Sequence, residues 1–472
     1  MTRRVALAVA ALAVAALAAP PGAAAHGLVT RADLPIPTWL FVWGAAAVIV
    51  VSFVALGALW REPRLEGDER FRPLPEIVGR ALTSRTVDVL CGAVGVALLV
   101  LVVWTGLVGV QSPQENFAPT FVYVIFWLGL VPLSLLFGDV FRAFNPWRAM
   151  GRVLERVVAR GAGEAIAYPH RLGRWPAAVG ILAFVWLEVI ATSGDQPRTI
   201  ALATMVYTAV TLVGMTLFGA ETWTRRAEAF SVYFGLLARM APLERRGRTL
   251  GLRPPLAGLS RLQADPGTIG VLVVLIGTVS FDGGSGGPAW NALLPSLTDA
   301  FGVLTPNPSL ALQGAYVLGL IAVLAGVGGF YLLGARGAAG GGLGTMDVAR
   351  AFVHSLVPIA FAYAAAHYVS LLVLQSQVIA PLASDPLGEG WNLLGTATWS
   401  VDYTLVGAET FWYIQVALVI AGHVAALTLA HDRALVLYGN VKQALRSQYW
   451  MLAVMIGYTT FALWLLSQAN EG

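Results

Sequence analysis

Three ionisable residues, Asp282, His367 and His423, lie in stretches of sequence that are otherwise apolar. An ionisable side chain at membrane depth is costly, so it usually pairs, binds an ion or relays a proton. Histidine and carboxylate are together a ligand set for zinc or copper, and they are equally the parts of a proton relay. We therefore expect the three side chains to converge in one site, as catalytic groups or as ligands of a divalent metal.

Polar residues beside these three are expected to contact a substrate. Tyr363 and Ser370 flank His367 at spacings of four and three, which places all three on one face of a helix. Ser280 precedes Asp282 by two residues. For each histidine the alternative is a hydrogen bond between helices, without any ligand. Haem held by two histidines is not favoured, because His367 and His423 differ by about 8 Å in expected depth.

Asp282 lies where an apolar helix is expected to break. The apolar run from Thr268 to Ser280 has 13 residues, or about 20 Å of helix, which is shorter than a hydrocarbon core of about 30 Å. Glycines and Pro288 follow, so we expect a broken helix at 280–290. Asp282 would then face the negative end of a half-helix, which suits a cation. The alternative is an ordinary helix end followed by a glycine-rich outer loop.

The N-terminus resembles a secretory signal. Arg3 and Arg4 precede a short apolar stretch, and small residues follow up to Ala25. Cleavage after Ala25 would expose His26, whose amine and imidazole can chelate Cu(II) in one plane. His26 is therefore a further candidate metal ligand, and the alternative is a chance residue after the cleavage site.

The composition is typical of a membrane protein. Apolar residues make up 57% of the 472 residues and charged residues only 12%, about half the charge of an ordinary soluble domain. The mean hydropathy is +0.72. We expect an all-α, polytopic transmembrane bundle with about ten spans after the signal peptide: 38–60, 87–110, 119–138, 176–193, 199–219, 268–281, 309–334, 351–377, 411–430 and 448–467.

The arginines support this topology. If the mature N-terminus lies outside, 26 of the 28 basic residues after residue 25 fall in inward segments, and only Arg31 and Arg198 fall outside. We therefore expect a bacterial inner-membrane protein with both mature termini outside the cytoplasm. The positive charge is a topology signal, so no nucleic-acid partner is expected. The expected partners are the lipid bilayer and a small molecule or ion, and the sequence indicates no protein partner.

The sequence divides into a signal peptide and two membrane halves. We expect residues 1–25 to be the signal, 26–219 the first five spans, 220–267 a basic cytoplasmic loop, and 268–472 the second five spans. The long outer segment 378–410 is expected to act as a lid over the site. His431, beside Asp432 and Arg433, is expected at the solvated inner edge.

Several of these segments together resemble a bacterial family of polytopic membrane proteins, some of whose members carry the label fenitrothion hydrolase. The resemblance lies in Ala25-His26-Gly27, Asp33 to Pro37, Ser280 to Gly283, and His354 through His367-Tyr368. It implies hydrolysis of small organophosphorus-type esters and assigns no catalytic residue. A metal held by His and Asp would activate water for this reaction. The alternative is a secondary permease for a cation or small substrate.

Overall fold

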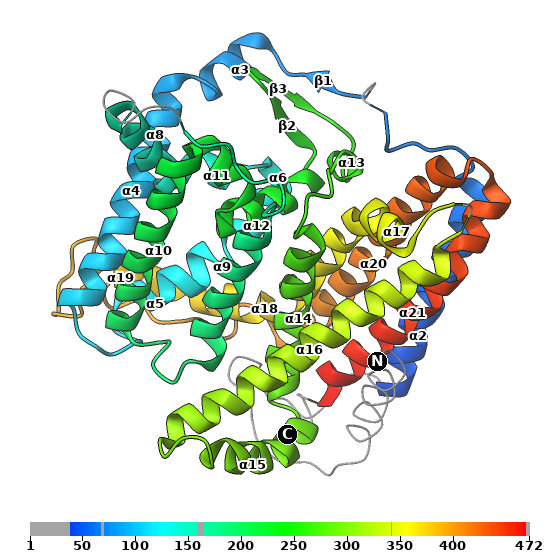
Figure 1. Ribbon diagram of the computed structural model, residues 1–472. Coiled ribbons are helices and arrows are strands. Elements are labelled where there is room, and N and C mark those ends of the chain that lie inside the picture. The colour runs from blue at the N-terminus through cyan, green and yellow to red at the C-terminus, as the bar shows by residue number, and fades with distance from the viewer. Residues whose placement is uncertain (1–37, 68–69, 159–164, 341, 469–472) are drawn as a thin grey trace.

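The computed structural model describes residues 38–67, 70–158, 165–340 and 342–468, and these residues form a mostly helical molecule (Figure 1). The predicted signal peptide and His26 lie outside the described residues. Seven helical segments are long and apolar enough to cross a membrane: Glu76–Val108, Phe117–Phe137, Pro197–Phe218, Thr268–Ser285, Pro308–Ala338, Thr345–Ser384 and Ala408–Tyr438. The expected class, a membrane protein built as an α-helical bundle, is confirmed at this level.

Every predicted span coincides with helix in the structure. The elements concerned are α2 (Thr38–Leu59), α4 (Arg85–Val108), α5 (Phe117–Thr120) with η1 (Phe121–Phe126) and α6 (Leu130–Phe137), α9 (Trp175–Val185) with η2 (Trp186–Ile190), α10 (Pro197–Phe218), α14 (Thr268–Ser285), α16 (Pro308–Ala338), α18 (Leu356–Gln375), α20 (Ala408–Tyr438) and α21 (Val441–Gln468).

Shorter elements connect these helices. They are β1 (Arg72–Pro73), α3 (Glu76–Leu82), α7 (Val140–Phe144), α8 (Pro146–Val158), α11 (Ala220–Arg226), α12 (Ala229–Leu237), η3 (Ala238–Met240), β2 (Leu243–Arg246), β3 (Thr249–Leu252), α13 (Ala257–Ser260), α15 (Pro288–Gly302), α17 (Thr345–Phe352), η4 (Val353–Ser355), η5 (Ser376–Val378) and α19 (Ile379–Ser384). The three strands form one antiparallel sheet in the order β1-β3-β2.

The first helix does not pack with the first half of the chain. In Figure 1, α2 (blue) lies beside α21 (red), far from α4 and α10. Ile49 and Phe53 of α2 are buried against Leu427 of α20. The chain then crosses to the other helices through the segment between α2 and α3. Residue 219 therefore divides the sequence into two predicted halves, but in the folded structure α2 packs with helices of the second half.

The segment 220–267 is not a loop. It contains three helices and the β2–β3 hairpin, and α12 lies in the hydrophobic core. All nine residues of α12 except Ser231 and Gly235 are buried, as expected for a helix that is apolar on every side. Its rings pack on aromatic residues from other helices: Phe230 on Trp147, and Tyr233 on Trp127. The segment was expected to be a basic cytoplasmic connection; the structure adds that it contains helices, and its side of the membrane stays a prediction.

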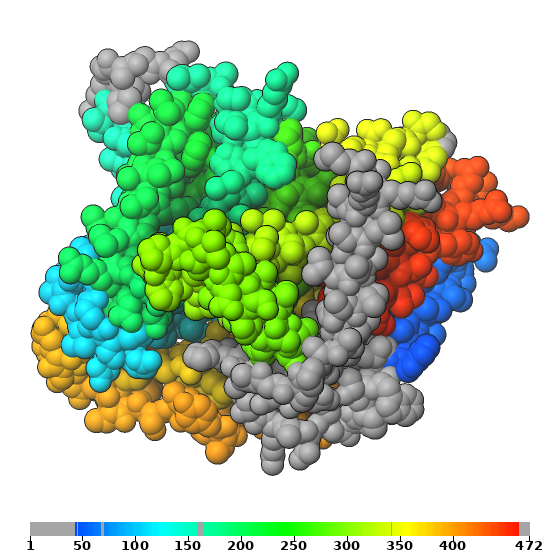
Figure 2. Space-filling view, turned by 60° about the horizontal axis from the view of Figure 1, so that its bottom comes forward, coloured from blue at the N-terminus to red at the C-terminus, as the bar shows by residue number. Residues whose placement is uncertain are grey.

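Contacts between connecting segments occur at both ends of the helix bundle. At the predicted inner end, Ser260 donates to the carbonyl of Leu65, and Thr83 donates to that of Arg248. At the other end, the amide of Val110 donates to the carbonyl of Leu387 at 2.8 Å. Figure 2 brings this second end forward, with segment 385–407 (orange) beside the α4–α5 region (cyan).

Helices α18 and α20, which carry the predicted histidines, pack closely. A Cβ added to Gly422 would lie 2.2 Å from the Cβ of Ala362, so only glycine permits this separation. Close approach at small residues is the usual way in which membrane helices associate.

Candidate functional site: a buried acid, histidine and tyrosine cluster

Asp282 and His367 meet between α14 and α18. Nε2 of His367 lies 3.0 Å from Oδ2 of Asp282, and the hydroxyl of Tyr368 donates to the same oxygen at 2.6 Å. Both contacts suit an ionised carboxylate, which accepts at either oxygen. The His367 side chain is 9% exposed and that of Asp282 is 27% exposed, so one side of the carboxyl faces open space.

A second carboxyl, Glu188, belongs to this cluster and was missed in the sequence. It lies in η2 (Trp186–Ile190), whose Ile190 belongs to the same hydrophobic cluster as Phe281, the residue before Asp282. The buried Oε2 of Glu188 has no hydrogen-bond partner among the described residues. The sequence did contain a signal for Glu188. It is an acidic residue inside the predicted span 176–193, and an acidic residue at membrane depth indicates a functional site.

The backbone at Glu188 is a turn of π-helix. The amide of Ala191 donates to the carbonyl of Trp186, five residues earlier, at 2.9 Å. Such turns are rare, and they occur frequently at functional sites, where they redirect a side chain. Glu188, the acidic residue of η2, therefore lies in this π-helical turn.

One nitrogen of His367 remains available. Nδ1 is buried and has no hydrogen-bond partner among the described residues. Gly283 lies beside it, since a Cβ added there would be 3.6 Å from Nδ1. At Gly284 an added Cβ would have nothing within 4 Å. A Cβ at Gly283 would thus be in ordinary contact with the imidazole, whose Nδ1 is enclosed by the protein.

The helix that carries Asp282 ends later than expected. α14 continues to Ser285, whose hydroxyl donates to the carbonyl of Asp282 at 2.9 Å. The interruption lies at Gly286 and Gly287, and α15 follows at Pro288. A break within 280–290 is present, but Asp282 lies in the last turn of a continuous helix. The glycines do not end the helix at 280 because nothing in the packing opposes its continuation.

Ser280 and Tyr363 form a second polar group one turn away from Asp282. The hydroxyl oxygens of Ser280 and Tyr458 are 2.7 Å apart, and Ser280 also donates to the carbonyl of Ile276. Tyr363 is buried nearby on α18. Ser370 is 3% exposed, and its hydroxyl has no partner among the described residues. Tyr458, on α21, was not predicted.

His423 does not join Asp282 and His367. Its Nδ1 donates to the carbonyl of Val419 at 2.7 Å, and its Nε2 lies 2.7 Å from the hydroxyl of Thr459. Both ring nitrogens therefore have protein partners. Among the described residues no three His, Cys, Asp or Glu side chains could hold a metal ion. The expected three-residue zinc or copper site is therefore not formed, because His423 faces α21 rather than α14.

His431 and Asp432 are buried rather than solvated, at 0% and 1% exposure. Asp432 accepts hydrogen bonds from the Trp60 indole and from the amides of Arg64 and Leu65. Nε2 of His431 donates to the carbonyl of Trp60 at 2.9 Å. These two residues hold the segment after α2 in place, which is a structural role. The expectation of a solvated edge was wrong.

The fold and the cluster together define a helical membrane protein in which an aspartate, an imidazole and a phenol are joined by hydrogen bonds among apolar helices, with a further carboxyl, Glu188, on η2. Comparison with protein-family models, with curated proteins and with solved structures finds no match.

Proposed function

We propose that the chain is a proton-coupled secondary permease of the bacterial inner membrane. One observation carries this proposal: two acidic residues, Glu188 and Asp282, lie within apolar helices, and among the described residues Asp282 has hydrogen-bond donors whereas the buried Oε2 of Glu188 has none. An unpaired carboxylate in such surroundings is costly, so Glu188 requires a proton or a cation. Two carboxyls in one apolar site favour the binding and release of a proton as their shared charge changes.

The exchange would use the groups around Asp282. When Asp282 is ionised, Tyr368 and the Nε2–H of His367 donate to it, and Nδ1 of His367, which has no partner among the described residues, can take up a proton. The resulting imidazolium is balanced by Asp282. A proton on Glu188 would relieve its repulsion with Asp282. The proposal includes ten crossings with the arginine-rich segments in the cytoplasm and both termini outside.

The test is proton exchange by the purified protein in liposomes that contain a pH-sensitive dye. After an external pH step, we expect proton entry through the wild type and its loss in Asp282→Asn and Glu188→Gln. Asp195→Asn is the matched control, because Asp195 is an exposed carboxyl at the predicted outer end. Unchanged exchange in both site variants, with normal folding, would contradict the proposal.

A second candidate is hydrolysis of small organophosphorus-type esters, as the family resemblance implies. One observation favours it: Asp282 orients His367 while Nδ1 stays free, so the imidazole can take a proton from attacking water. No metal takes part in this version. Release of a chromogenic phenol from an aryl phosphate triester, lost in His367→Gln, would support hydrolysis. If the protein and its variants release no phenol from the triester but still exchange protons, the permease is favoured.

A further inference from the structure

The turn before α9 and the helix α11 together form a basic surface at the predicted inner end. Arg171 in the turn and Arg225 on α11 are exposed. The guanidinium carbon of Arg226 lies 5.8 Å from the centre of the Tyr168 ring, which belongs to the same turn. Arg225 donates from Nε to the backbone carbonyl of Glu221. Three arginines from two segments therefore lie around this turn.

The charge of these arginines is not balanced by the protein. Arg171, Arg225 and Arg226 form no ion pair with a carboxyl among the described residues. One carboxyl, Asp265, lies on the segment that packs against the turn, but it is 3.7 Å from the guanidinium of the buried Arg174. A surplus of positive charge remains at the surface, and an anionic partner would balance it.

An apolar stripe continues from the basic surface along α9. Trp175, Val179, Ala183 and Trp186 are exposed at spacings of four, four and three, so they share one face of the helical segment. Trp175 is 51% exposed and Val179 is 63% exposed. The order of residue types, from Arg171 through tryptophan to aliphatic side chains, follows a bilayer from headgroup through interface to acyl chains. The stripe therefore continues the lipid-facing surface up to the arginines.

The same turn joins α9 to the start of α14, and the two helices lie beside each other (Figure 1). The amide of Arg174 donates to the carbonyl of Pro266 at 2.6 Å, and its guanidinium donates to the hydroxyl of Thr268 at 3.0 Å. The ring of Trp175 covers Gly270, because a Cβ added to this glycine would lie 2.6 Å from the ring. The basic surface therefore lies where α9 and α14 are fastened together.

Glu188 and Asp282 lie at similar distances from this junction. Glu188 follows Trp175 by 13 residues and Asp282 follows Thr268 by 14 residues, which is about 20 Å along each helix. Helices transmit a shift at one end to the other because they are rigid. The packing of α9 on α14 at the junction therefore affects how far apart the two carboxyls lie.

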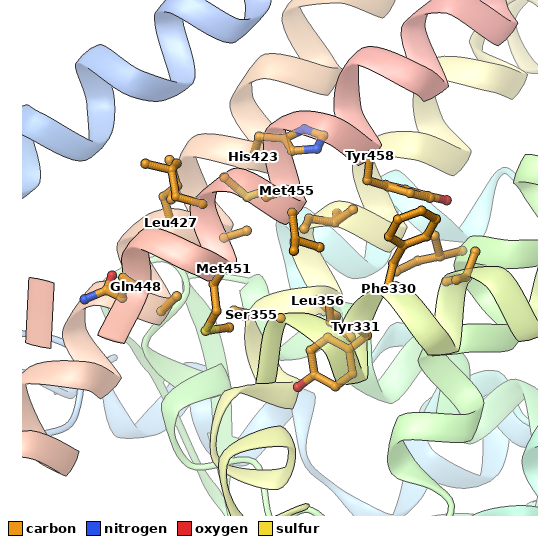
Figure 3. Close-up of a pocket in the computed structure, with 18 of the residues that line it drawn as sticks. Phe330, Tyr331, Ser355, Leu356, His423, Leu427, Gln448, Met451, Met455 and Tyr458 are labelled. Atoms are coloured by element: carbon orange, nitrogen blue, oxygen red, sulfur yellow. The ribbon is translucent and has the colours of Figure 1, made fainter. Parts of the chain in front are cut away.

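The apolar pocket between α14, α16, α18, α20 and α21 offers no comparable site (Figure 3). The described residues that line it include no arginine, lysine, aspartate or glutamate. Both ring nitrogens of His423 in its wall have protein partners. A charged headgroup in this pocket would have no counter-charge, which is costly in apolar surroundings.

We infer that the basic surface binds the headgroup of an anionic phospholipid. Basic pockets beside membrane helices on the cytoplasmic side bind such headgroups. Arg171, Arg225 and Arg226 contact the phosphate, and an acyl chain lies along Val179 and Ala183. The bound lipid joins α11 to the start of α9 and stabilises the packing of α9 on α14. Binding is independent of the proposed permease function, whereas an effect on proton exchange rests on it.

The test is photocrosslinking of the purified full chain in phosphatidylcholine nanodiscs that contain a phosphatidylglycerol probe with a diazirine on its acyl chain. We expect saturable crosslinks at Val179 and Ala183, located by mass spectrometry. A probe with the same chain and a phosphatidylcholine headgroup should crosslink there about tenfold less. Both probes should crosslink equally at Val206 and Val210, which are exposed on α10 and report the surrounding lipid.

Variants separate the arginines from general surface charge. Arg171→Gln combined with Arg226→Gln should remove the preference for phosphatidylglycerol, and the corresponding lysine pair should keep most of it because the charge remains. Arg85→Gln is the matched control, since Arg85 is an exposed arginine at the start of α4 at the same predicted end. In phosphatidylglycerol liposomes, the glutamine pair should exchange protons several-fold more slowly than Arg85→Gln. Asp282→Asn should lose exchange and keep the crosslinks, which distinguishes a failure of the permease from a failure of lipid binding.

Three results would overturn the inference. Equal crosslinking by the two probes at Val179 would show that this face contacts only the surrounding lipid. Loss of the crosslinks on addition of soluble glycerol phosphate would assign the arginines to a free phosphate compound. Equal proton exchange in the glutamine pair and in Arg85→Gln would remove the effect of the lipid on exchange.

Discussion

Nε2 of His367 lies 3.0 Å from Oδ2 of Asp282, and this contact joins α18 to α14 across residues 85 positions apart. The same carboxyl oxygen accepts from Tyr368, so two donors from adjacent positions on one helix converge on one acceptor of another. The pair leaves Nδ1 of His367 available. The contact therefore holds the two helices together and also presents a group that can take up a proton.

Asp282→Asn should remove proton exchange and cost little stability. The amide keeps the shape and one acceptor oxygen, so the loss should be about 1–2 kcal/mol. The measurements are proton entry into liposomes and the midpoint of thermal unfolding in detergent. Asp282→Leu, which removes both hydrogen bonds, should be less stable than Asp282→Asn. Retained exchange in a folded Asp282→Leu protein would assign the proton to another group.

Glu188 and Glu228 should respond differently to substitution. Glu228 accepts from Tyr207, from Asn145 and from the amides of Phe230 and Ser231, at the start of α12. Glu228→Ala should therefore destabilise the protein by about 2–4 kcal/mol. Glu188→Gln should change stability by less than about 1 kcal/mol while it abolishes exchange. Unfolding midpoints test the difference, and equal losses would mean that Glu188 is also structural.

Asp432→Ala should release the segment after α2. Three donors, on Trp60, Arg64 and Leu65, would lose their acceptor, at a cost of about 3 kcal/mol. Leu65 is 6% exposed in the intact protein. A cysteine at position 65, in a Cys91→Ser background, should react with a thiol reagent much faster in Asp432→Ala than in the parent. Equal reaction rates would show that packing alone holds the segment.

The proposed orientation predicts which introduced cysteines an impermeant reagent reaches from outside. Cysteines at Gln114, Ser193 and Leu393 should react in sealed cells, because these positions are exposed at the predicted outer end. Cysteines at Arg70, Arg156 and Gly340 should react only after the membrane is opened. Gly194 is unsuitable for an introduced cysteine, since a Cβ added there would lie 1.8 Å from the carbonyl oxygen of Leu187. Reaction of the second group in intact cells would overturn the topology.

Acid should loosen the β2–β3 hairpin through Glu244. Burial raises the pKa of Glu244, but hydrogen bonds from Arg261 and Arg246 and the charge of Arg253 outweigh it and bring the pKa below its ordinary 4.5. A carboxyl whose folded pKa is lowered stabilises the fold above its unfolded pKa and loses this contribution as pH falls through the folded value. Hydrogen exchange of the hairpin amides, compared between wild type and Glu244→Gln, should therefore differ at pH 7 and converge once the pH lies below the lowered pKa of Glu244. A constant difference would contradict this linkage.

The sequence alone determined where the chain is apolar, and therefore the class of protein. Hydrophobic length is a local property, so the stretches predicted as spans coincide with helices even where α9 and η2 are irregular. Asp282 and His367 were also identified locally, because an ionisable residue is conspicuous in an apolar run. Glu188 met the same criterion and could have been found. α12 could not be recognised as buried, since nine apolar residues between arginines are too short to indicate a membrane helix.

Only the tertiary structure decided which polar residues meet. The rise per residue gives the depth of a side chain along its helix, but the neighbour that it faces depends on how helices rotate and pack. His423 and His367 lie on adjacent helices, yet His423 turns toward Thr459 of α21 while His367 turns toward Asp282 of α14. The place of α2 beside α20 and α21 was likewise decided by packing, in which Ile49 and Phe53 are buried with Leu427. Dispersion and close approach between small residues select such partners, and neither leaves a periodic signal in a single chain.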